Sequence, residues 1–333
     1  MGDRIRFIDL FAGIGGFRLG FEKAGCECVF SSEIDLHACE MYRLNFNEDS
    51  YCDITTLNAR DVPDFDILCA GFPCQPFSIC GGQRGFYDEA RGTLFFDICR
   101  VLEEKRPRAF MLENVFNLVA HDKGRTLEVM LRSLGLLGYT VTYHVLNARD
   151  FNVPQNRERL IIVGNREGKY FDFDKIKKRT IWSMESYLDR GMDFDILDPS
   201  EYTILDSSVT KRQPRSGLIF CGYRNKGMSK VGVRLGAEHL SSVHNQGYRI
   251  YDASGTHPTL VSQEACGRYY IRTGCVVRKL TIRECFRFMG FPEDYKLCGT
   301  KAQLYARVGN SVCVNMVEEV AREMKAQFFT GQF

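Results

Sequence analysis

The chain has 333 residues and a mass of 38.1 kDa, enough for one large domain, or for a domain and a smaller one, with a substantial core. Hydrophobic residues make up 44% and charged residues 26%, a balance that excludes global disorder. No apolar run is long enough to span a membrane, and the N-terminus lacks the pattern of a signal peptide. We therefore expect a cytoplasmic protein with no membrane partner.

The net charge of +2 hides an uneven distribution. Between Leu205 and Gly290 there are 14 Lys and Arg residues against 5 Asp and Glu residues. One interpretation is a solvated, loop-rich surface. The other is a module that faces a polyanion, most often nucleic acid.

The 14 cysteines show no CxxC pair and no spacing with histidine that is typical of zinc ligands. Many stand in apolar strings, which favours buried, reduced thiols. We expect no metal site.

The first half alternates short apolar strands with helical patterns, which indicates a parallel sheet with crossover helices. The predicted strands are Ile5–Phe11, Glu27–Ser32, Ile67–Ala70, Ala109–Leu112, Thr140–Leu146 and Leu160–Val163. The predicted helices are 16–24, Leu36–Asn45, Thr93–Glu104 and Thr126–Leu137.

The pattern changes after about Gly168. Trp182–Leu188 is a candidate short helix, and Leu205–Cys275 is Gly-rich, basic and β-like, without a clear helix. Helical periodicity returns at the C-terminal end, and the predicted helices there are Thr281–Met289, Lys301–Val308 and Val312–Gln327.

The start of the chain is similar to a nucleotide-binding strand, turn and helix. Arg18 stands where the dinucleotide pattern has its third glycine, which disfavours NAD and FAD. A ligand with an adenosine and no phosphate fits this shorter turn better. Glu33 ends the second strand, where an acidic residue binds both ribose hydroxyls, and Asp53 is placed to accept from an adenine amino group. Ordinary loop chemistry is the alternative for each of them.

Reactive side chains follow several predicted strands. Cys74 lies in a Pro-Cys-Gln-Pro turn directly after an apolar strand, at the edge where open α/β sheets bind their ligands. Glu113 ends another strand, and Arg157 and Arg159 precede a third on the same face. Each alone could be a strand cap or a surface ion pair. Their combination at one sheet edge favours a catalytic site.

These motifs together resemble the DNA cytosine-5 methyltransferases, in the family's order and over nearly the whole chain. Asp9–Gly16 is similar to the adenosylmethionine motif and Gly71–Gln75 to the nucleophile motif. Glu113–Val115, Gln155–Arg159 and Gly309–Val312 match the partner, arginine and C-terminal motifs. The chain departs from a related enzyme by one extra residue between Cys74 and Arg91, and by Ile34, where that enzyme has a tryptophan against the adenine.

The resemblance implies a class I S-adenosylmethionine-dependent methyltransferase fold, Rossmann-like with a mostly parallel sheet, and a small β-rich target-recognition domain. The implied division is 1–185 for the catalytic domain, 186–275 for the DNA-binding domain and 276–333 for helices that complete the catalytic domain. The cofactor is S-adenosyl-L-methionine, with S-adenosyl-L-homocysteine as product and no metal. The implied cofactor-binding residues are Phe11, Gly13, Ile14, Gly15, Gly16, Glu33, Ile34, Asp53, Ile54, Pro73, Leu94, Asn310 and Val312.

The implied mechanism begins when the Cys74 thiolate adds to C6 of a flipped-out cytosine, which activates C5 toward the methyl group. Glu113, protonated because a dry pocket raises its pKa, donates to N3. Arg159 contacts O2, and Arg157 supports it. Glycines at 81, 82, 85 and 92 suit a closing loop. No residue is an obvious base for the C5 proton, and water can serve.

The implied partner is double-stranded DNA. In one family member the residue that matches Gln246 fills the space left by the flipped base, and the residue that matches Arg249 reads guanine. Thr259 has a role in positioning the DNA backbone, and a GCGC-like target is a guess. We expect a monomer from a prokaryotic or phage host, with a possible cognate restriction endonuclease. A tRNA-modifying cytosine methyltransferase and an inactive binding protein of the same fold are the alternatives.

Overall fold

A computed structural model describes residues 4–73, 94–191, 194–225, 236–262 and 270–330. Cys74 and the predicted closing loop at 75–92 lie outside the described residues. The chain forms two compact units. The first unit comprises 1–146, 158–177 and 311–333, and the second comprises 147–157 and 178–310. These boundaries differ from the predicted division at 185 and 275, and the functional roles assigned to those ranges remain predictions.

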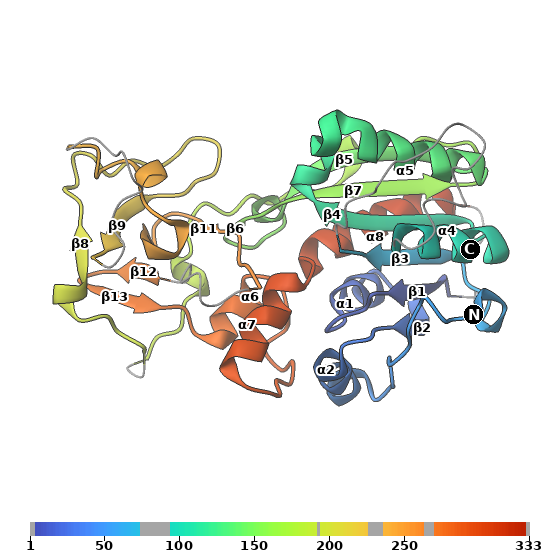
Figure 1. Cartoon of the computed structure of the whole chain (residues 1–333), viewed down its shortest axis with the longest axis horizontal. Helices are drawn as coiled ribbons and strands as arrows, with labels where there is room; N and C mark the ends of the chain where they lie inside the picture. Colours follow the sequence, from blue (N-terminus) through green and yellow to red (C-terminus); the bar gives the residue numbers. More distant parts are fainter. Residues whose placement is uncertain (1–3, 74–93, 192–193, 226–235, 263–269, 331–333) are drawn as a thin grey trace. The chain divides into compact units, whose positions relative to one another are not determined.

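The first unit is built on a six-stranded sheet, whose β1, β3 and β4 lie side by side in Figure 1. In spatial order its strands are β2 (Glu27–Ser32), β1 (Arg6–Leu10), β3 (Ile67–Gly71), β4 (Ala109–Val115), β7 (Glu158–Asn165) and β5 (Thr140–Asn147). The pairs among β2, β1, β3 and β4 are parallel, and β7 is antiparallel to β4. No crossover helix lies between β5 and β7, so β7 does not return in the parallel direction.

Five helices accompany this sheet in the described residues, and the apolar period of each explains its burial. They are α1 (Gly16–Lys23), α2 (Leu36–Phe46), α4 (Leu94–Lys105), α5 (Arg125–Leu136) and α8 (Val314–Phe328). In α4 the buried side chains recur with helical spacing at Phe95, Ile98, Cys99 and Leu102 and join the core formed by β1, β3 and β4.

A glycine sets the packing of α1 against α8. A Cβ atom at Gly20 would lie 2.5 Å from Cγ1 of Val317, which is closer than real side chains approach. The two helices therefore meet through the bare backbone of Gly20, and this contact brings the C-terminal helix against the helix that follows the glycine turn.

The second unit contains a five-stranded sheet and a two-stranded one. The strands of the larger sheet are β13 (Val276–Lys279), β12 (Tyr270–Thr273), β10 (Arg249–Asp252), β9 (Phe220–Arg224) and β8 (Tyr202–Ile204). The smaller sheet pairs β6 (Gln155–Asn156) in parallel with β11 (His257–Pro258). The helices are α6 (Ile282–Arg287) and α7 (Lys301–Asn310).

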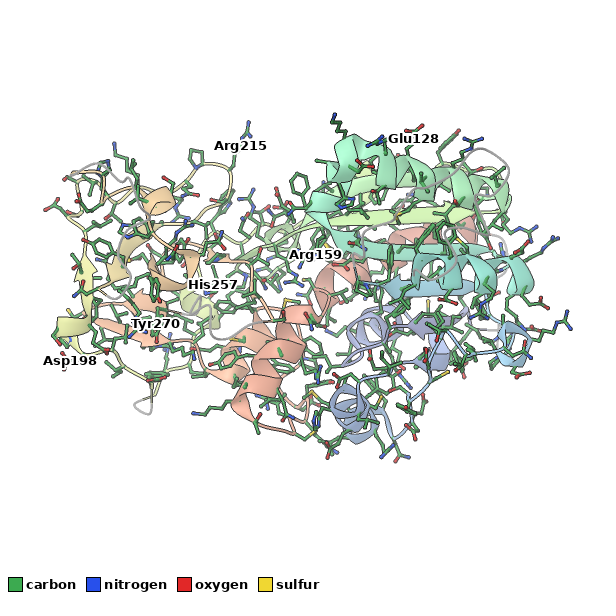
Figure 2. All side chains as sticks on the ribbon, viewed as in Figure 1. Glu128, Arg159, Asp198, Arg215, His257 and Tyr270 are labelled. Atoms are coloured by element: carbon green, nitrogen blue, oxygen red, sulfur yellow. The ribbon has the colours of Figure 1, made fainter. Side chains whose placement is uncertain are left out.

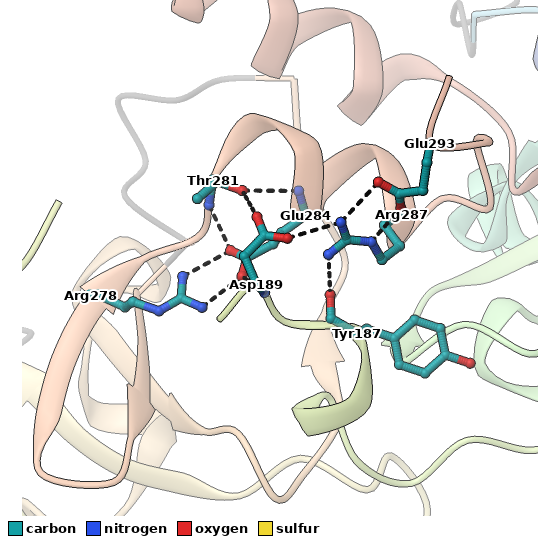
Figure 3. A network of polar contacts seen from close by, with 7 residues as sticks. All are labelled: Tyr187, Asp189, Arg278, Thr281, Glu284, Arg287 and Glu293. Carbon is teal, nitrogen blue, oxygen red and sulfur yellow. Dashed lines mark hydrogen bonds and ion pairs between the residues drawn. The ribbon is translucent and has the colours of Figure 1, made fainter. Parts of the chain in front are cut away.

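A polar network surrounds the start of α6 (Figure 3). Thr281 and Glu284 form a reciprocal capping box, which satisfies two backbone N–H groups at the helix start. The Glu284 carboxylate also accepts hydrogen bonds from both terminal nitrogens of Arg278, at 2.8 and 2.6 Å, and both side chains are buried. Arg287 joins the network by its ion pair with Asp189 at 2.9 Å. The network joins β13, α6 and the segment around residue 189 within this unit.

The structure confirms the existence of each strand and helix predicted in the first half, with ends that match or shift by up to three residues. The predicted short helix at Trp182–Leu188 is a 3₁₀ turn, Glu185–Tyr187. The described part of 205–275 holds strands and no α-helix, as predicted, and it also holds 3₁₀ turns. Most of the described cysteines are buried, and in the described residues no helix is long and apolar enough to cross a membrane.

Candidate functional site

The glycine turn after β1 has a shape that side chains would obstruct. Gly13 and Gly15 have left-handed φ values of 54° and 80°, which glycine adopts without strain. A Cβ atom at Gly16 would lie 2.7 Å from Oγ of Ser311 and 2.8 Å from Cγ2 of Val312. The turn is therefore in direct contact with the segment that precedes α8, which places the first and last motifs together in the first unit.

Glu33 ties this turn to the end of β2. One carboxylate oxygen accepts the Gly13 N–H at 2.8 Å, and the other accepts the N–H groups of Ile34 and Asp35 at 2.9 and 2.8 Å. Oε1 already accepts two N–H groups, whereas Oε2 accepts one, so Oε2 keeps a lone-pair direction for a hydroxyl donor from a ligand. The carboxylate is thus held in one orientation beside the glycine turn.

Two apolar residues lie just after β1 and β2, one with an unusual backbone conformation and the other with an unusually exposed side chain. Phe11 follows β1 with a φ of 60°, a left-handed conformation that is costly for a bulky side chain and is concentrated at functional sites. Ile34 follows β2 and is 62% exposed, although it is apolar. Such a residue suits contact with the flat face of a ligand.

Asp53 lies after β2 and before β3 and is held by its neighbour. Its Oδ1 accepts the backbone N–H and the hydroxyl of Thr55, at 2.9 and 2.8 Å. These hydrogen bonds lower the pKa of Asp53, so it is an ionised acceptor at neutral pH. Ile54 beside it is buried in the core.

The sheet register places Glu113 and Arg159 together on adjacent strands. Arg159 lies opposite Val115 in the β4–β7 pair, so Glu113 is its diagonal neighbour on the same face. The Nε of Arg159 lies 2.8 Å from Oε1 of Glu113, and both side chains are almost buried, at 12% and 10% exposed. Arg159, which lies at the start of β7, is labelled in Figure 2. A carboxyl group and a guanidinium are thus paired at the end of the sheet where β4 stops.

The neighbouring residue Asn114 fixes the chain that leads to Cys74. Its Nδ2 donates to the Phe72 carbonyl at 3.0 Å, and both residues are buried. Gly71, at the end of β3, pairs with Glu113 in the parallel register. A Cβ atom at Gly71 would lie 3.2 Å from Phe17 and 3.7 Å from Oε2 of Glu113, so the glycine leaves room beside that carboxyl.

Arg157 has different surroundings from Arg159. It is 1% exposed and belongs to the second unit, where its guanidinium donates to the carbonyl oxygens of Leu260 at 2.9 Å and Gly309 at 3.0 Å. These contacts hold backbone rather than a carboxylate. Arg157 therefore joins three segments of its own unit.

The predicted DNA-reading residues lie in the second unit with local partners. Arg249 donates from Nε and Nη2 to the His244 carbonyl, at 3.2 and 2.9 Å, and the His244 ring stacks on Tyr223 with centroids 4.1 Å apart. Gln246 is exposed. The Thr259 hydroxyl donates to the Asn156 carbonyl at 2.9 Å.

The relatives of this chain settle its family. Residues 5–326 match the C-5 cytosine-specific DNA methylase family. The chain is 40% identical over 326 residues to the Type II methyltransferase M.HhaI of Haemophilus parahaemolyticus, covering 95% of this chain and 93% of that protein. It is 41% identical over 311 residues to M.NgoBI of Neisseria gonorrhoeae, covering 93% and 90%. The chain belongs to the C-5 cytosine-specific DNA methylase family.

A solved structure with a similar fold is the S. pombe Dnmt2 methyltransferase, with a TM-score of 0.67 at 20% identity over 97% of this chain and 99% of that one. This likeness shows a mixed α/β fold with a large sheet. By its family match and its relatives the chain is a DNA cytosine-5 methyltransferase, and its family implies S-adenosylmethionine as methyl donor.

In this methyltransferase the structure brings together the glycine turn, Glu33, Ser311 and Val312, and it pairs Glu113 with Arg159. Of the other residues predicted for the cofactor, Ile14 is buried, Leu94 is half-buried, and Pro73 and Asn310 are exposed. Sequence reasoning did not select Asn114, Ser311 or Gln155. Each stands inside one of the sequence motifs, but the hydrogen-bond or packing partner of such a polar residue becomes apparent only in the folded chain.

Proposed function

We propose that this methyltransferase transfers a methyl group from S-adenosyl-L-methionine to C5 of a flipped-out cytosine in a specific double-stranded DNA sequence, through a covalent Cys74–C6 adduct. The observation that carries the proposal is the almost buried pair of Glu113 and Arg159, beside the end of β3, which Cys74 follows closely in the sequence. A carboxyl group and a fixed cation at one point match the polar edge of a cytosine ring.

The residues around the glycine turn fit the adenosine half of the cofactor. Three of the four residues in the turn at 13–16 are glycines, Glu33 offers an oriented carboxylate for ribose hydroxyls, and Asp53 is an ionised acceptor for an amino group. Phe11 and Ile34 supply apolar faces for the base. When bound, S-adenosylmethionine supplies the methyl group for C5 and leaves as S-adenosylhomocysteine.

Cys74, Glu113 and Arg159 are proposed to act on the cytosine ring in turn. The Cys74 thiolate forms a bond to C6, and the electron pair of the C5–C6 double bond moves through the ring toward N3 and O2. Glu113 donates a proton to N3, and Arg159 stabilises the charge at O2. C5 then takes the methyl group and loses its proton to water, and the C6–S bond breaks to release Cys74 as thiolate. N3 returns its proton to Glu113, which leaves neutral 5-methylcytosine.

The second unit is proposed to hold and read the DNA. The base must leave the duplex before C6 can be reached, at a cost of a few kcal/mol. Gln246 is exposed and free to enter the space that the base leaves. Arg249 is proposed to read guanine, the commonest arginine contact to a base, and must then leave the His244 carbonyl. Thr259 has one hydroxyl proton, so contact with a phosphate requires it to release Asn156.

A covalent trap tests the proposal. Duplex DNA with 5-fluorocytosine at the target should form a stable adduct in the presence of S-adenosylmethionine, because fluorine does not leave C5 as a proton does. Cys74→Ser should abolish the adduct, and Cys275→Ser, at an exposed cysteine, should retain it. An adduct that survives in Cys74→Ser would overturn the assignment. The same assay with tRNA beside duplex DNA decides between the two nucleic acids.

The partner proposal extends from the relatives that are named Type II methyltransferases. We propose that the enzyme acts as a monomer and protects DNA from a restriction endonuclease of the same target sequence. Methylation of mixed-sequence DNA followed by mapping of the modified cytosines gives the target. Sedimentation of the enzyme with and without its target duplex gives the oligomeric state.

A further inference from the structure

One four-residue stretch of the second unit, Thr259–Ser262, is held by contacts from two distant segments, 155–157 and the end of α7 at Gly309. The buried amide of Gln155 accepts the Leu260 N–H on Oε1 at 3.0 Å. Arg157 donates to the Leu260 carbonyl at 2.9 Å, so both backbone groups of Leu260 have a buried side-chain partner. The Thr259 hydroxyl returns a hydrogen bond to the Asn156 carbonyl.

The other ends of the same two side chains reach different elements. Nε2 of Gln155 donates to the Phe288 carbonyl at 2.9 Å, just beyond α6, and Nη2 of Arg157 donates to the Gly309 carbonyl at 3.0 Å, near the end of α7. Gln155 and Arg157 are 0% and 1% exposed, so each is a strut inside the unit rather than a surface contact. Buried side chains that are hydrogen-bonded at both ends favour one arrangement of the backbone.

Gly309 completes the contact from the opposite side. A Cβ atom there would lie 2.5 Å from the Ser262 nitrogen and closer still to the Val261 carbonyl group. The helix α7 thus meets the backbone of Val261–Ser262 directly, and the pairing of β6 with β11, both labelled in Figure 1, fixes the approach from the other direction.

We propose that Gln155 and Arg157 are positioning residues that hold the Thr259–Ser262 backbone in the geometry required for binding target DNA. The inference rests on the proposed role of Thr259 at the DNA backbone. It gives Arg157 a function distinct from that of Arg159: Arg157 acts through Leu260 and Gly309 on the DNA-binding segment and does not touch the reacting base.

The test is a double-mutant cycle on DNA affinity, measured on folded protein. Gln155→Leu removes the acceptor of the Leu260 N–H and should raise the Kd for target duplex about tenfold, while the Kd for S-adenosylmethionine changes less than twofold. If Gln155 acts through this segment, adding Thr259→Val should raise the Kd no further than the more severe single variant does. Full additivity, or an unchanged Kd in Gln155→Leu, overturns the proposal.

Matched variants separate positioning from general stability. Tyr139→Phe removes a buried hydrogen bond of 3.0 Å to the Pro107 carbonyl in the first unit and should leave the DNA Kd unchanged. If Gln155→Leu does not fold, Gln155→Glu keeps the acceptor for Leu260 and loses the donor to Phe288, and Arg157→Lys keeps one donor. Both should raise the DNA Kd severalfold, and a normal Kd in both contradicts the proposal. A wild-type enzyme that binds no DNA contradicts the proposed function instead.

Discussion

At the scale of single residues, the site depends on side chains whose hydrogen bonds fix their orientation before any ligand arrives. Glu33 is the clearest case, since three backbone N–H groups from two segments converge on its two oxygens. Such preorganisation lowers the cost of binding, because the carboxylate does not need to be oriented when the ligand enters. Because each of these hydrogen bonds requires an acceptor oxygen, replacing one carboxylate oxygen by a donor should disturb the orientation of the side chain.

Glu33→Gln should weaken the binding of S-adenosylmethionine. The amide keeps the size of the carboxylate but replaces one acceptor oxygen by a donor, which opposes a backbone N–H and removes a charge-assisted acceptor for the ribose. A loss of about 1.5–3 kcal/mol corresponds to a Kd that rises roughly tenfold to a hundredfold. Titration calorimetry measures this change. Glu40→Gln, at an exposed position of α2, should bind the cofactor normally, and equal affinities in the two variants would refute the ribose assignment.

Asp9 gives the protein a predicted dependence of stability on pH. Burial within β1 raises the pKa of Asp9 from 3.8 to about 8, against the opposing effects of the Arg18 backbone N–H and guanidinium. Between these two values the folded chain holds a proton that the unfolded chain has released. Its contribution to the free energy of unfolding is therefore complete below pH 3.8 and falls as pH rises toward 8, by up to about 1.4 kcal/mol per pH unit.

Asp9→Asn should remove this dependence, because the amide does not titrate. Urea unfolding of both proteins between pH 5.5 and pH 8 provides the comparison. The stability of the variant relative to wild type should rise steadily across this range and level off above pH 8. Parallel stability curves for the two proteins would show that Asp9 titrates below the range tested.

At the scale of elements, glycines have opposite roles in two helices of the first unit. Gly20 in α1 leaves space for Val317 of α8, whereas Gly135 in α5 has no atom within 4 Å of the position of a Cβ. The helical propensity of alanine favours both substitutions equally, by about 1 kcal/mol. Packing therefore decides the sign of each effect.

Gly20→Ala should destabilise the protein, because the added methyl group forces α8 away from α1 or distorts Val317. Overpacking of this kind costs about 1–3 kcal/mol, which exceeds the gain in propensity. Gly135→Ala should instead stabilise by about 0.5–1 kcal/mol. Unfolding free energies of the two variants test the packing directly, and a stabilised Gly20→Ala variant would contradict the contact between α1 and α8.

At the scale of the whole molecule, the local excess of positive charge and the proposed recognition of DNA belong to the second unit. A phosphate contact contributes on every sequence and steepens the salt dependence of binding, whereas a contact to a base edge discriminates between sequences. The local excess of Lys and Arg in Leu205–Gly290 should supply both kinds. We expect Arg249, whose guanidinium donates to the His244 carbonyl, to contact a base. We expect Arg215, which is exposed and labelled in Figure 2, to contact a phosphate.

Arg249→Ala should lower methylation of the preferred site far more than methylation of near-cognate sites, with a difference of about 1–3 kcal/mol. Arg215→Ala should weaken binding to all sequences alike and reduce the salt slope by about one unit. Methylation rates on a panel of duplexes at two or more salt concentrations separate the two patterns. An even loss across all sites in Arg249→Ala, with a shallower salt slope, would make it a phosphate contact.

The sequence alone was enough for the family, the order of the strands and helices, and the glycine turn with Glu33. These features depend on local periodicity, on turn residues and on motifs that are contiguous in the chain. Sequence reasoning also selected Glu113 and Arg159, because each stands at the end of an apolar strand.

Only the tertiary structure separated Arg159 from Arg157. The two residues are two positions apart and look equivalent in the sequence, but one pairs with Glu113 and the other holds the Leu260 and Gly309 carbonyls. The partners of Gln155 and Asn114 were hidden for the same reason, since their contacts lie 42 to 133 residues away. Local patterns determine which way a strand residue points, but strand register and long-range packing determine what it meets.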